Sequence, residues 1–216
     1  MHFPVLRRVA AALLGAGGLG VAVTTSLEVV TAPYSPAVSL YPLNGVVHLV
    51  KVAAIFAFAA GLLGLLKHLG SRLGRLGSGA GLVLVVATLA GAVPYSLIEA
   101  FLDPRLTPGA ANTRLDAIYD DHVWVGAIGS VAMPILLLAV VTLAVVVLRR
   151  RVLPLWAPVC SLLMVLLGIA VLVLSESTGV ALPHPPAWIF LGLATYGAAI
   201  LAADRAEERD LHTQPA

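Results

Sequence analysis

Six apolar segments divide this chain, and each is long enough to cross the hydrocarbon core of a lipid bilayer. A membrane-spanning helix needs about 20 mainly apolar residues to cover roughly 30 Å of hydrocarbon. Backbone polar groups inside a bilayer must bond to one another, so such segments form helices. The sequence therefore predicts an all-α fold, a polytopic transmembrane bundle of six helices within residues 1–203. The expected spans are 9–30, 46–66, 80–102, 123–148, 153–174 and 187–203.

Proline and glycine are frequent between the expected spans, which favours turns and loops there. The longest of these loops is expected at 103–122. Hydrophobic residues make up 60% of the chain and charged residues only 11%, against about 25% charged residues in soluble proteins. An ordinary soluble domain is thereby excluded.

Two functional classes lose support from the composition. The basic residues stand beside the apolar segments rather than in a patch with aromatic residues, so nucleic-acid binding is not indicated. The single cysteine, Cys160, cannot form an internal disulfide and lies in an apolar run. Thiol-redox chemistry is therefore a poor candidate.

The basic residues also predict the orientation, because cytoplasmic loops of membrane proteins are enriched in lysine and arginine. With six spans, one side carries most of the basic loop and terminal residues, and the other carries only Arg105 and Arg114. We therefore expect both termini in the cytoplasm, with 204–216 as a short cytoplasmic tail. The basic residues of the predicted cytoplasmic side are Arg7, Arg8, Lys67, Arg72, Arg75, Arg149, Arg150, Arg151, Arg205 and Arg209.

The expected location is the cell (cytoplasmic) membrane of a bacterium, as a multi-pass protein. Arginine strongly outnumbers lysine, and alanine, leucine, valine and glycine are abundant, as in proteins from high-GC bacterial genomes. The first apolar segment also resembles a secretory signal peptide. Its apolar run is longer than a typical signal core, and no A-x-A-like cleavage site follows. We expect it to remain as an uncleaved first span.

Lys51 is the most unusual polar residue, since it lies inside the second apolar segment. An unpaired lysine near the centre of a bilayer costs roughly 2.5–3.5 kcal/mol on insertion scales. Its side chain either snorkels to the membrane surface or pairs with an acid, for which Glu28 and Glu99 are the candidates. The predicted orientation places all three residues in the outer half of the membrane. Asp121 and His122 stand at the outer start of the fourth span.

Helical spacing gathers these polar residues on two faces. One face begins the second span, where three polar residues follow an i, i+4, i+7 pattern. The other lies on the third span, where Tyr95 precedes Glu99 by four residues and follows Pro94, a residue that kinks a helix. Together the two faces predict a polar pocket that is open to the outside. The expected substrate-binding residues are Asn44, His48, Lys51, Tyr95 and His122.

Three functions fit such a pocket. The first is binding of a membrane lipid or an isoprenoid-like, apolar small molecule. The alternative is a membrane-embedded enzyme in which a carboxyl group, kept protonated by apolar surroundings, acts as general acid on an isoprenoid or a lipid, as in terpene cyclases. The candidate acids are Glu99, Glu28 and Asp121, although the P-x-E-E pattern of carotenoid cyclases is missing. The third is a small transporter, against which speaks the lack of an inverted repeat.

Structural explanations stand beside the functional ones. Asp121 and His122 also suit the N-terminus of the fourth span, where acidic and polar side chains cap a helix. His48 and His122, at similar depth, would allow haem or zinc ligation, but the close ligand spacing of such sites is missing. We therefore expect no cofactor and no metal, and the oligomeric state is left open.

Several short motifs give the chain a resemblance to a known family. Tyr34 and Pro36 begin a stretch that is similar to a Y-x-P-x-x-x-S-x-L motif, with the serine one position off. The third span ends near an Asp103–Pro104 pair, and Pro134 follows His122 by twelve residues in the fourth. In these features the chain resembles a bacterial six-helix membrane family of unknown function that is related to DRAM- and Sfk-type proteins. The resemblance implies six helices and a membrane location, and it assigns no activity.

Overall fold

The structure is a computed structural model that describes residues 3–31, 43–103, 106, 108–180 and 182–213. Over these residues the chain is helical and contains no strands. Five of the helices that it describes are long and apolar enough to cross a membrane, in agreement with the predicted all-α class. The helices are α1 (Phe3–Thr31), α3 (Asn44–Ala100), α4 (Pro108–Asp121), α5 (Val123–Arg150), α6 (Trp156–Thr178) and α7 (Pro185–Thr213).

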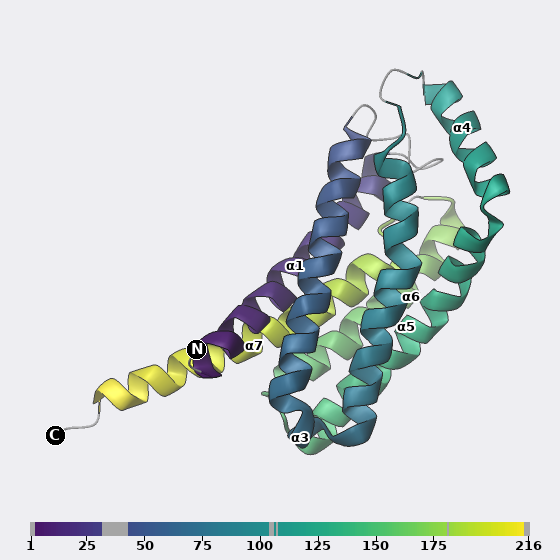
Figure 1. The fold of residues 1–216 in the computed structure, drawn as a ribbon. Coiled ribbons are helices and arrows are strands. Elements are labelled where there is room, and N and C mark those ends of the chain that lie inside the picture. Colours follow the sequence, from purple (N-terminus) through teal and green to yellow (C-terminus); the bar gives the residue numbers. More distant parts are fainter. Residues whose placement is uncertain (1–2, 32–42, 104–105, 107, 181, 214–216) are drawn as a thin grey trace.

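The longest helix, α3, folds back on itself at Gly74, so that its two halves form a hairpin (Figure 1). Gly74 has φ 67° and ψ −176°, a backbone conformation that is essentially restricted to glycine. The halves are antiparallel: a Cβ added at Gly45 would lie 3.0 Å from the carbonyl oxygen of Ala100. The second and third expected spans are thus both parts of α3. The turn expected between them is reduced to a single residue.

The stretch 103–122, which we expected as a loop, contains the helix α4. Pro108 begins α4 at the position where its missing N–H group is not needed. Ala111 and Leu115, one turn apart, pack with Leu102 in a small cluster separate from the main core. The prediction of a loop was wrong because these apolar residues are too few to mark a helix by composition.

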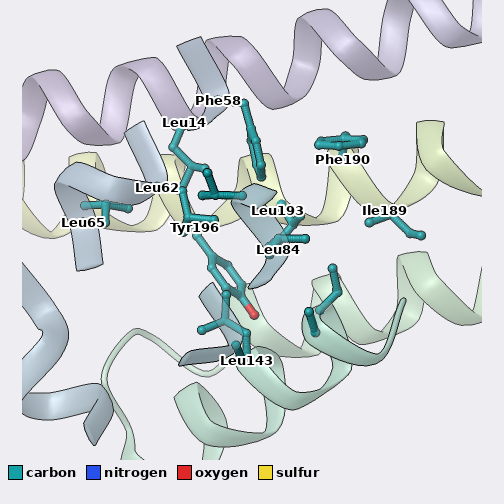
Figure 2. Close-up of a cluster of buried hydrophobic side chains, with 14 of the residues drawn as sticks. Leu14, Phe58, Leu62, Leu65, Leu84, Leu143, Ile189, Phe190, Leu193 and Tyr196 are labelled. Carbon is teal, nitrogen blue, oxygen red and sulfur yellow. The ribbon is translucent and has the colours of Figure 1, made fainter. Parts of the chain in front are cut away.

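The main core lies between the long helices and is built from apolar side chains of each (Figure 2). α1 packs against the first half of α3 and against α7, while α5 packs against the second half of α3 and against α6. Leu14, Phe58, Leu84, Leu143 and Leu193 are almost completely buried there. The rings of Phe58 and Phe190 pack edge to face, with centroids 4.9 Å apart and planes at 81°.

The start of α1 and the end of α7 lie at the same end of the bundle (Figure 1). Arg7 and Arg8 of α1 make ion pairs with Asp204 of α7, and the Asp204 side chain is buried. Because α3 turns at Gly74 against the guanidinium group of Arg150, the C-terminus of α5 lies at this end too. α7 is longer than its expected span and continues to Thr213.

Candidate functional site

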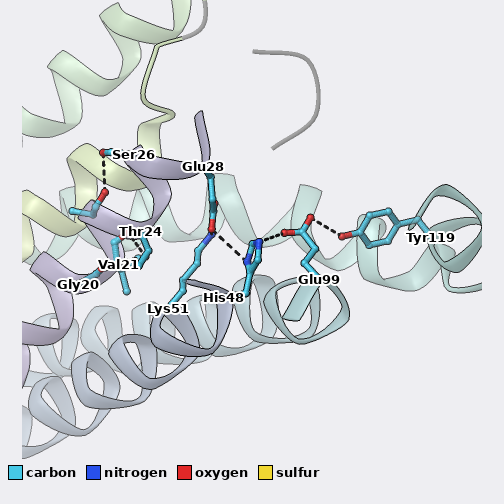
Figure 3. A network of polar contacts seen from close by, with 10 residues as sticks. Gly20, Val21, Thr24, Ser26, Glu28, His48, Lys51, Glu99 and Tyr119 are labelled. Carbon is cyan, nitrogen blue, oxygen red and sulfur yellow. Dashed lines mark hydrogen bonds and ion pairs between the residues drawn. The ribbon is translucent and has the colours of Figure 1, made fainter. Parts of the chain in front are cut away.

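The candidate site lies at the opposite end of the bundle, where α1 ends and the two ends of α3 meet. α1 contributes Glu28 from its final turns, and α3 contributes His48 and Lys51 from its beginning and Glu99 from its end. The antiparallel course of α1 and the hairpin of α3 bring these four side chains into one row (Figure 3). They are 5%, 0%, 8% and 0% exposed, respectively. The row is therefore withdrawn from the surface of the bundle.

Lys51 and Glu28 form the first contact of the row. The Lys51 ammonium group donates hydrogen bonds to both carboxylate oxygens of Glu28, at 3.0 Å and 2.8 Å. Both oxygens of the acid are thus used by one lysine, which suits a charged pair away from water. Lys51 therefore pairs with Glu28, and its side chain is almost fully buried.

His48 links the two acids because each ring nitrogen contacts a different carboxylate. Its Nδ1 lies 3.4 Å from Glu28 Oε1, and its Nε2 lies 2.7 Å from Glu99 Oε2. The ring is completely buried between them. A histidine in this position can exchange a proton with either acid, because each of its ring nitrogens faces one carboxylate oxygen.

Tyr119 of α4 completes the row at Glu99. The Tyr119 hydroxyl donates a hydrogen bond to Glu99 Oε1 at 3.2 Å, and its ring stacks on Tyr95 of α3 with centroids 5.5 Å apart. Burial and the negative charge of Glu99 raise the pKa of Tyr119 far above its ordinary value. The phenol therefore stays protonated and acts as a donor to the acid.

The charges of the row balance in a way that allows one proton to move. With Lys51 and His48 protonated and both glutamates ionised, the row carries no net charge. The 2.7 Å separation of His48 Nε2 and Glu99 Oε2 lets a proton pass between these two atoms without changing the net charge of the row. The arrangement can thus place an acidic proton at Glu99, next to the hydroxyl of Tyr119.

The sequence predicted several of these residues as members of one site, and the structure brings together Glu28, His48, Lys51, Glu99 and Tyr95. Asn44 was also predicted to belong to this site. It begins α3, but its side chain is not among the parts that the structure describes.

Asp121 and His122 lie apart from the row. Asp121 is exposed and ends α4. His122 is exposed and occupies the N-cap position of α5, where its Nδ1 lies 2.9 Å from the carbonyl oxygen of Ile118. His122 thus stands at the N-cap position that the helix-end explanation predicted, but its side chain makes no capping hydrogen bond to α5. Among the described residues, no group of three histidine, cysteine or acidic side chains is arranged to hold a metal ion.

Tyr119 is the member of the row that sequence reasoning missed. It lies in the stretch that was expected to be a loop, and no spacing relates it to Glu99, twenty residues earlier. A usable signal was present in the register of Ala111, Leu115 and Tyr119, which recur at intervals of four and share one helical face.

The fold and composition define an all-helical protein of the multi-pass membrane class. No family model matches the chain, and no curated protein or solved structure is significantly similar to it. The resemblance to the DRAM- and Sfk-related family stays a prediction. Its motif at Tyr34 and Pro36 lies outside the described residues, as does Pro104.

Proposed function

We propose that the chain crosses the bacterial cytoplasmic membrane six times, with both termini in the cytoplasm. The support is the separation of charge along the bundle: Arg7, Arg72, Arg75 and Arg150 all belong to the end where α1 begins and α7 ends. Cytoplasmic ends of spans are enriched in such residues. A fluorescent-protein fusion at the C-terminus tests the orientation, because the fluorophore matures in the cytoplasm. If this fusion is dark, and a reporter that works only in the periplasm is active at the same position, the proposed orientation is reversed.

We further propose that the row in the outer half of the bundle binds the polar group of a lipid or of an apolar small molecule. One observation carries this proposal: four ionisable side chains contact one another in succession and are almost completely buried. The last of them, Glu99, is covered by Tyr119 of α4, a helix too short to cross a membrane. Ionisable groups within a membrane are costly and commonly mark ligand or ion pathways.

We infer that a ligand reaches Glu99 past α4, because Tyr119 of α4 contacts this acid. This helix is attached through the small cluster of Leu102, Ala111 and Leu115 and through the contacts of Tyr119. Few buried apolar contacts mean a low cost of local opening. When α4 moves away, a ligand hydroxyl or amine takes the place of the Tyr119 hydroxyl at Glu99, and its apolar part extends along the bundle into the lipid.

Mass spectrometry of molecules that co-purify with the protein tests this binding. The wild type is expected to retain a characteristic lipid or apolar compound that is reduced in Glu99→Gln and in Tyr119→Phe. Tyr196→Phe is the matched control, since it removes the same hydroxyl from a tyrosine of α7 in the core. Equal retention by Glu99→Gln, in a variant with wild-type thermal stability, would contradict the proposal.

A second candidate function is general acid catalysis, and the 2.7 Å contact between His48 Nε2 and Glu99 Oε2 favours it. Glu99 would donate a proton to a double bond or a leaving group of an isoprenoid or lipid, and His48 would restore the proton to Glu99. Membranes that contain the wild type are then expected to form a product from an added isoprenoid, and Glu99→Gln membranes are not. Normal turnover by Glu99→Gln, at equal expression, would exclude this mechanism.

A further inference from the structure

A second feature of the bundle lies away from the row, on the surface between the second half of α3 and α5. Two apolar grooves follow one another here, with volumes of about 650 Å³ and 270 Å³. Val83 of α3 and Ile135 of α5 line both, so the two adjoin and together follow the two helices as one groove. We call it the α3–α5 groove.

The two ends of the α3–α5 groove differ: its lining is apolar along its length and basic at one end. It extends from Ala90 to Arg75, which borders the groove where α3 approaches its turn. Fifteen residues of helix separate these two positions, about 22 Å at 1.5 Å per residue. One leaflet of a bilayer offers about 15 Å of hydrocarbon. The groove is thus long enough for an acyl chain of the leaflet that faces Arg75.

The basic end contains more than one arginine. Arg72, Arg75 and the run 149–151 are exposed around the turn of α3 and the C-terminus of α5. Arg72 donates to the carbonyl oxygen of Arg151, and Arg150 donates to that of Arg72, each at 3.4 Å. Within the described part of the chain, none of these guanidinium groups forms an ion pair with a carboxylate. Their charge is therefore available to an anion.

The floor of the groove next to Arg75 is a glycine. Gly79 lines the groove, and a Cβ added there would meet no atom within 4 Å. Space therefore remains beside the helix backbone one turn from the arginine. A chain that lies in this space brings a headgroup attached to its end beside Arg75.

We propose that the α3–α5 groove binds an anionic phospholipid of the cytoplasmic leaflet, with one acyl chain in the groove and the phosphate group at Arg75 and its neighbouring arginines. The leaflet rests on the proposed orientation, whereas the groove and its charge do not depend on the proposed outer site. Basic pockets between spans on the cytoplasmic side are suited to anionic headgroups. Charge complementarity and an apolar length matched to a lipid chain thus select the same occupant.

Native mass spectrometry of the full-length protein in detergent tests the proposal, with an equimolar mixture of phosphatidylglycerol and phosphatidylcholine that carry the same chains. The wild type is expected to bind phosphatidylglycerol in preference. Arg75→Gln is expected to lower this preference about fivefold, the effect of one basic residue near an anionic surface. Gly79→Phe, which fills the groove, is expected to lower the binding of both lipids.

Two control variants match these changes. Arg205→Gln removes an exposed arginine of α7 from the same end of the bundle. Gly129→Phe adds the same ring at a helical glycine of α5 whose Cβ would also meet no atom within 4 Å, outside the lining of the α3–α5 groove. Both are expected to bind the two lipids as the wild type does.

Three results would overturn the proposal. Equal binding of both lipids by the wild type removes the role of charge, and an unchanged preference in Arg75→Gln removes the role of that arginine. If Gly79→Phe alters the oligomeric state and leaves lipid binding unchanged, a second copy of the chain covers the groove. Loss of the outer ligand in Glu99→Gln is measured separately, so failure of one site is distinguishable from failure of the other. A reversed orientation would show in the C-terminal fusion alone.

Discussion

The Lys51 ammonium group lies 2.8 Å and 3.0 Å from the two carboxylate oxygens of Glu28, across the contact between α3 and α1. Each charge is almost fully buried and has the other as its partner. This relationship accounts for a lysine within an apolar span, because the pair is removed from water together. It also makes each residue depend on the other.

Replacing Lys51 alone is therefore expected to destabilise the bundle. Lys51→Met removes the ammonium group that contacts both oxygens of the buried Glu28 carboxylate and leaves it the longer contact with His48. Loss of one partner of a buried ion pair costs about 3–5 kcal/mol. The double variant Lys51→Met, Glu28→Gln is expected to recover most of this loss, since no charge is then left alone. Thermal unfolding in detergent, followed by circular dichroism, measures both effects.

The control for this pair is Lys67→Met, which removes an exposed lysine from the same half of α3. It is expected to change the unfolding temperature very little, because exposed charges contribute little to stability. If the double variant were as unstable as Lys51→Met, the buried pair would not be the cause.

The spans could be predicted from the sequence because their signal is local: about 20 apolar residues in succession must form a helix in a bilayer. The suggestion that Lys51 pairs with Glu28 or Glu99 followed from the cost of a lone charge. The choice of Glu28 could not follow, because it depends on how far α1 and α3 are rotated and displaced against each other. The spacing of residues along each helix does not reveal how the two helices are rotated against each other.

His48 and Tyr119 illustrate the same limit. His48 was placed on the face of Lys51 by spacing, but its position between two acids depends on the hairpin that returns Glu99 to the start of α3. That hairpin in turn depends on one residue, Gly74, among several glycines of the stretch. Tyr119 reaches Glu99 from a short helix of mixed polarity, for which composition gives almost no signal.

Close packing of α1 against α3 leads to a second prediction. A Cβ added at Gly17 would lie 2.3 Å from the backbone nitrogen of Phe58, and one added at Gly61 would lie 2.3 Å from that of Leu14. These contacts involve backbone on both sides, so the helices must separate to admit a methyl group. Gly17→Ala and Gly61→Ala are each expected to destabilise the bundle by about 1–3 kcal/mol.

Gly129→Ala on α5 is the matched control, because its added methyl group meets no atom within 4 Å. It is expected to be neutral or to stabilise the helix by up to about 1 kcal/mol. Thermal unfolding of the three alanine variants in the same detergent compares them. A decrease in Gly129→Ala as large as in Gly17→Ala would show that loss of glycine, rather than helix contact, is responsible.

The junction of α1 and α7 gives a third prediction. The Asp204 side chain is 3% exposed and forms ion pairs with Arg7 and Arg8, whose side chains are more than one third exposed. Asp204→Asn removes the charge that both arginines contact. A buried polar group that loses a hydrogen-bond partner lowers the free energy of unfolding by about 1–3 kcal/mol. Exposure of the arginines places the expected loss toward the lower end.

Glu207→Gln tests whether burial matters at this junction. Glu207 also contacts Arg7, at 3.6 Å, but its side chain is 72% exposed. Its replacement is expected to leave the unfolding temperature almost unchanged. Equal losses in the two variants would mean that the ion pairs at this end act only through surface charge, which raising the salt concentration would cancel.

The turn of α3 gives the last prediction. Gly74 has a positive φ with extended ψ, and a Cβ added there would lie 2.7 Å from a guanidinium nitrogen of Arg150. Gly74→Ala is expected to cost about 1–3 kcal/mol in backbone strain. A Cβ added at Gly70, four residues earlier, would make only an ordinary contact of 3.5 Å with the Ser78 hydroxyl, so Gly70→Ala is expected to be tolerated.

Because the turn returns Glu99 to His48, Gly74→Ala is also expected to weaken ligand retention at the outer row, while Gly70→Ala preserves it. Unfolding temperatures and co-purifying molecules, measured on the same preparations, separate these outcomes. Unchanged values of both in Gly74→Ala would mean that the hairpin does not depend on glycine at this position.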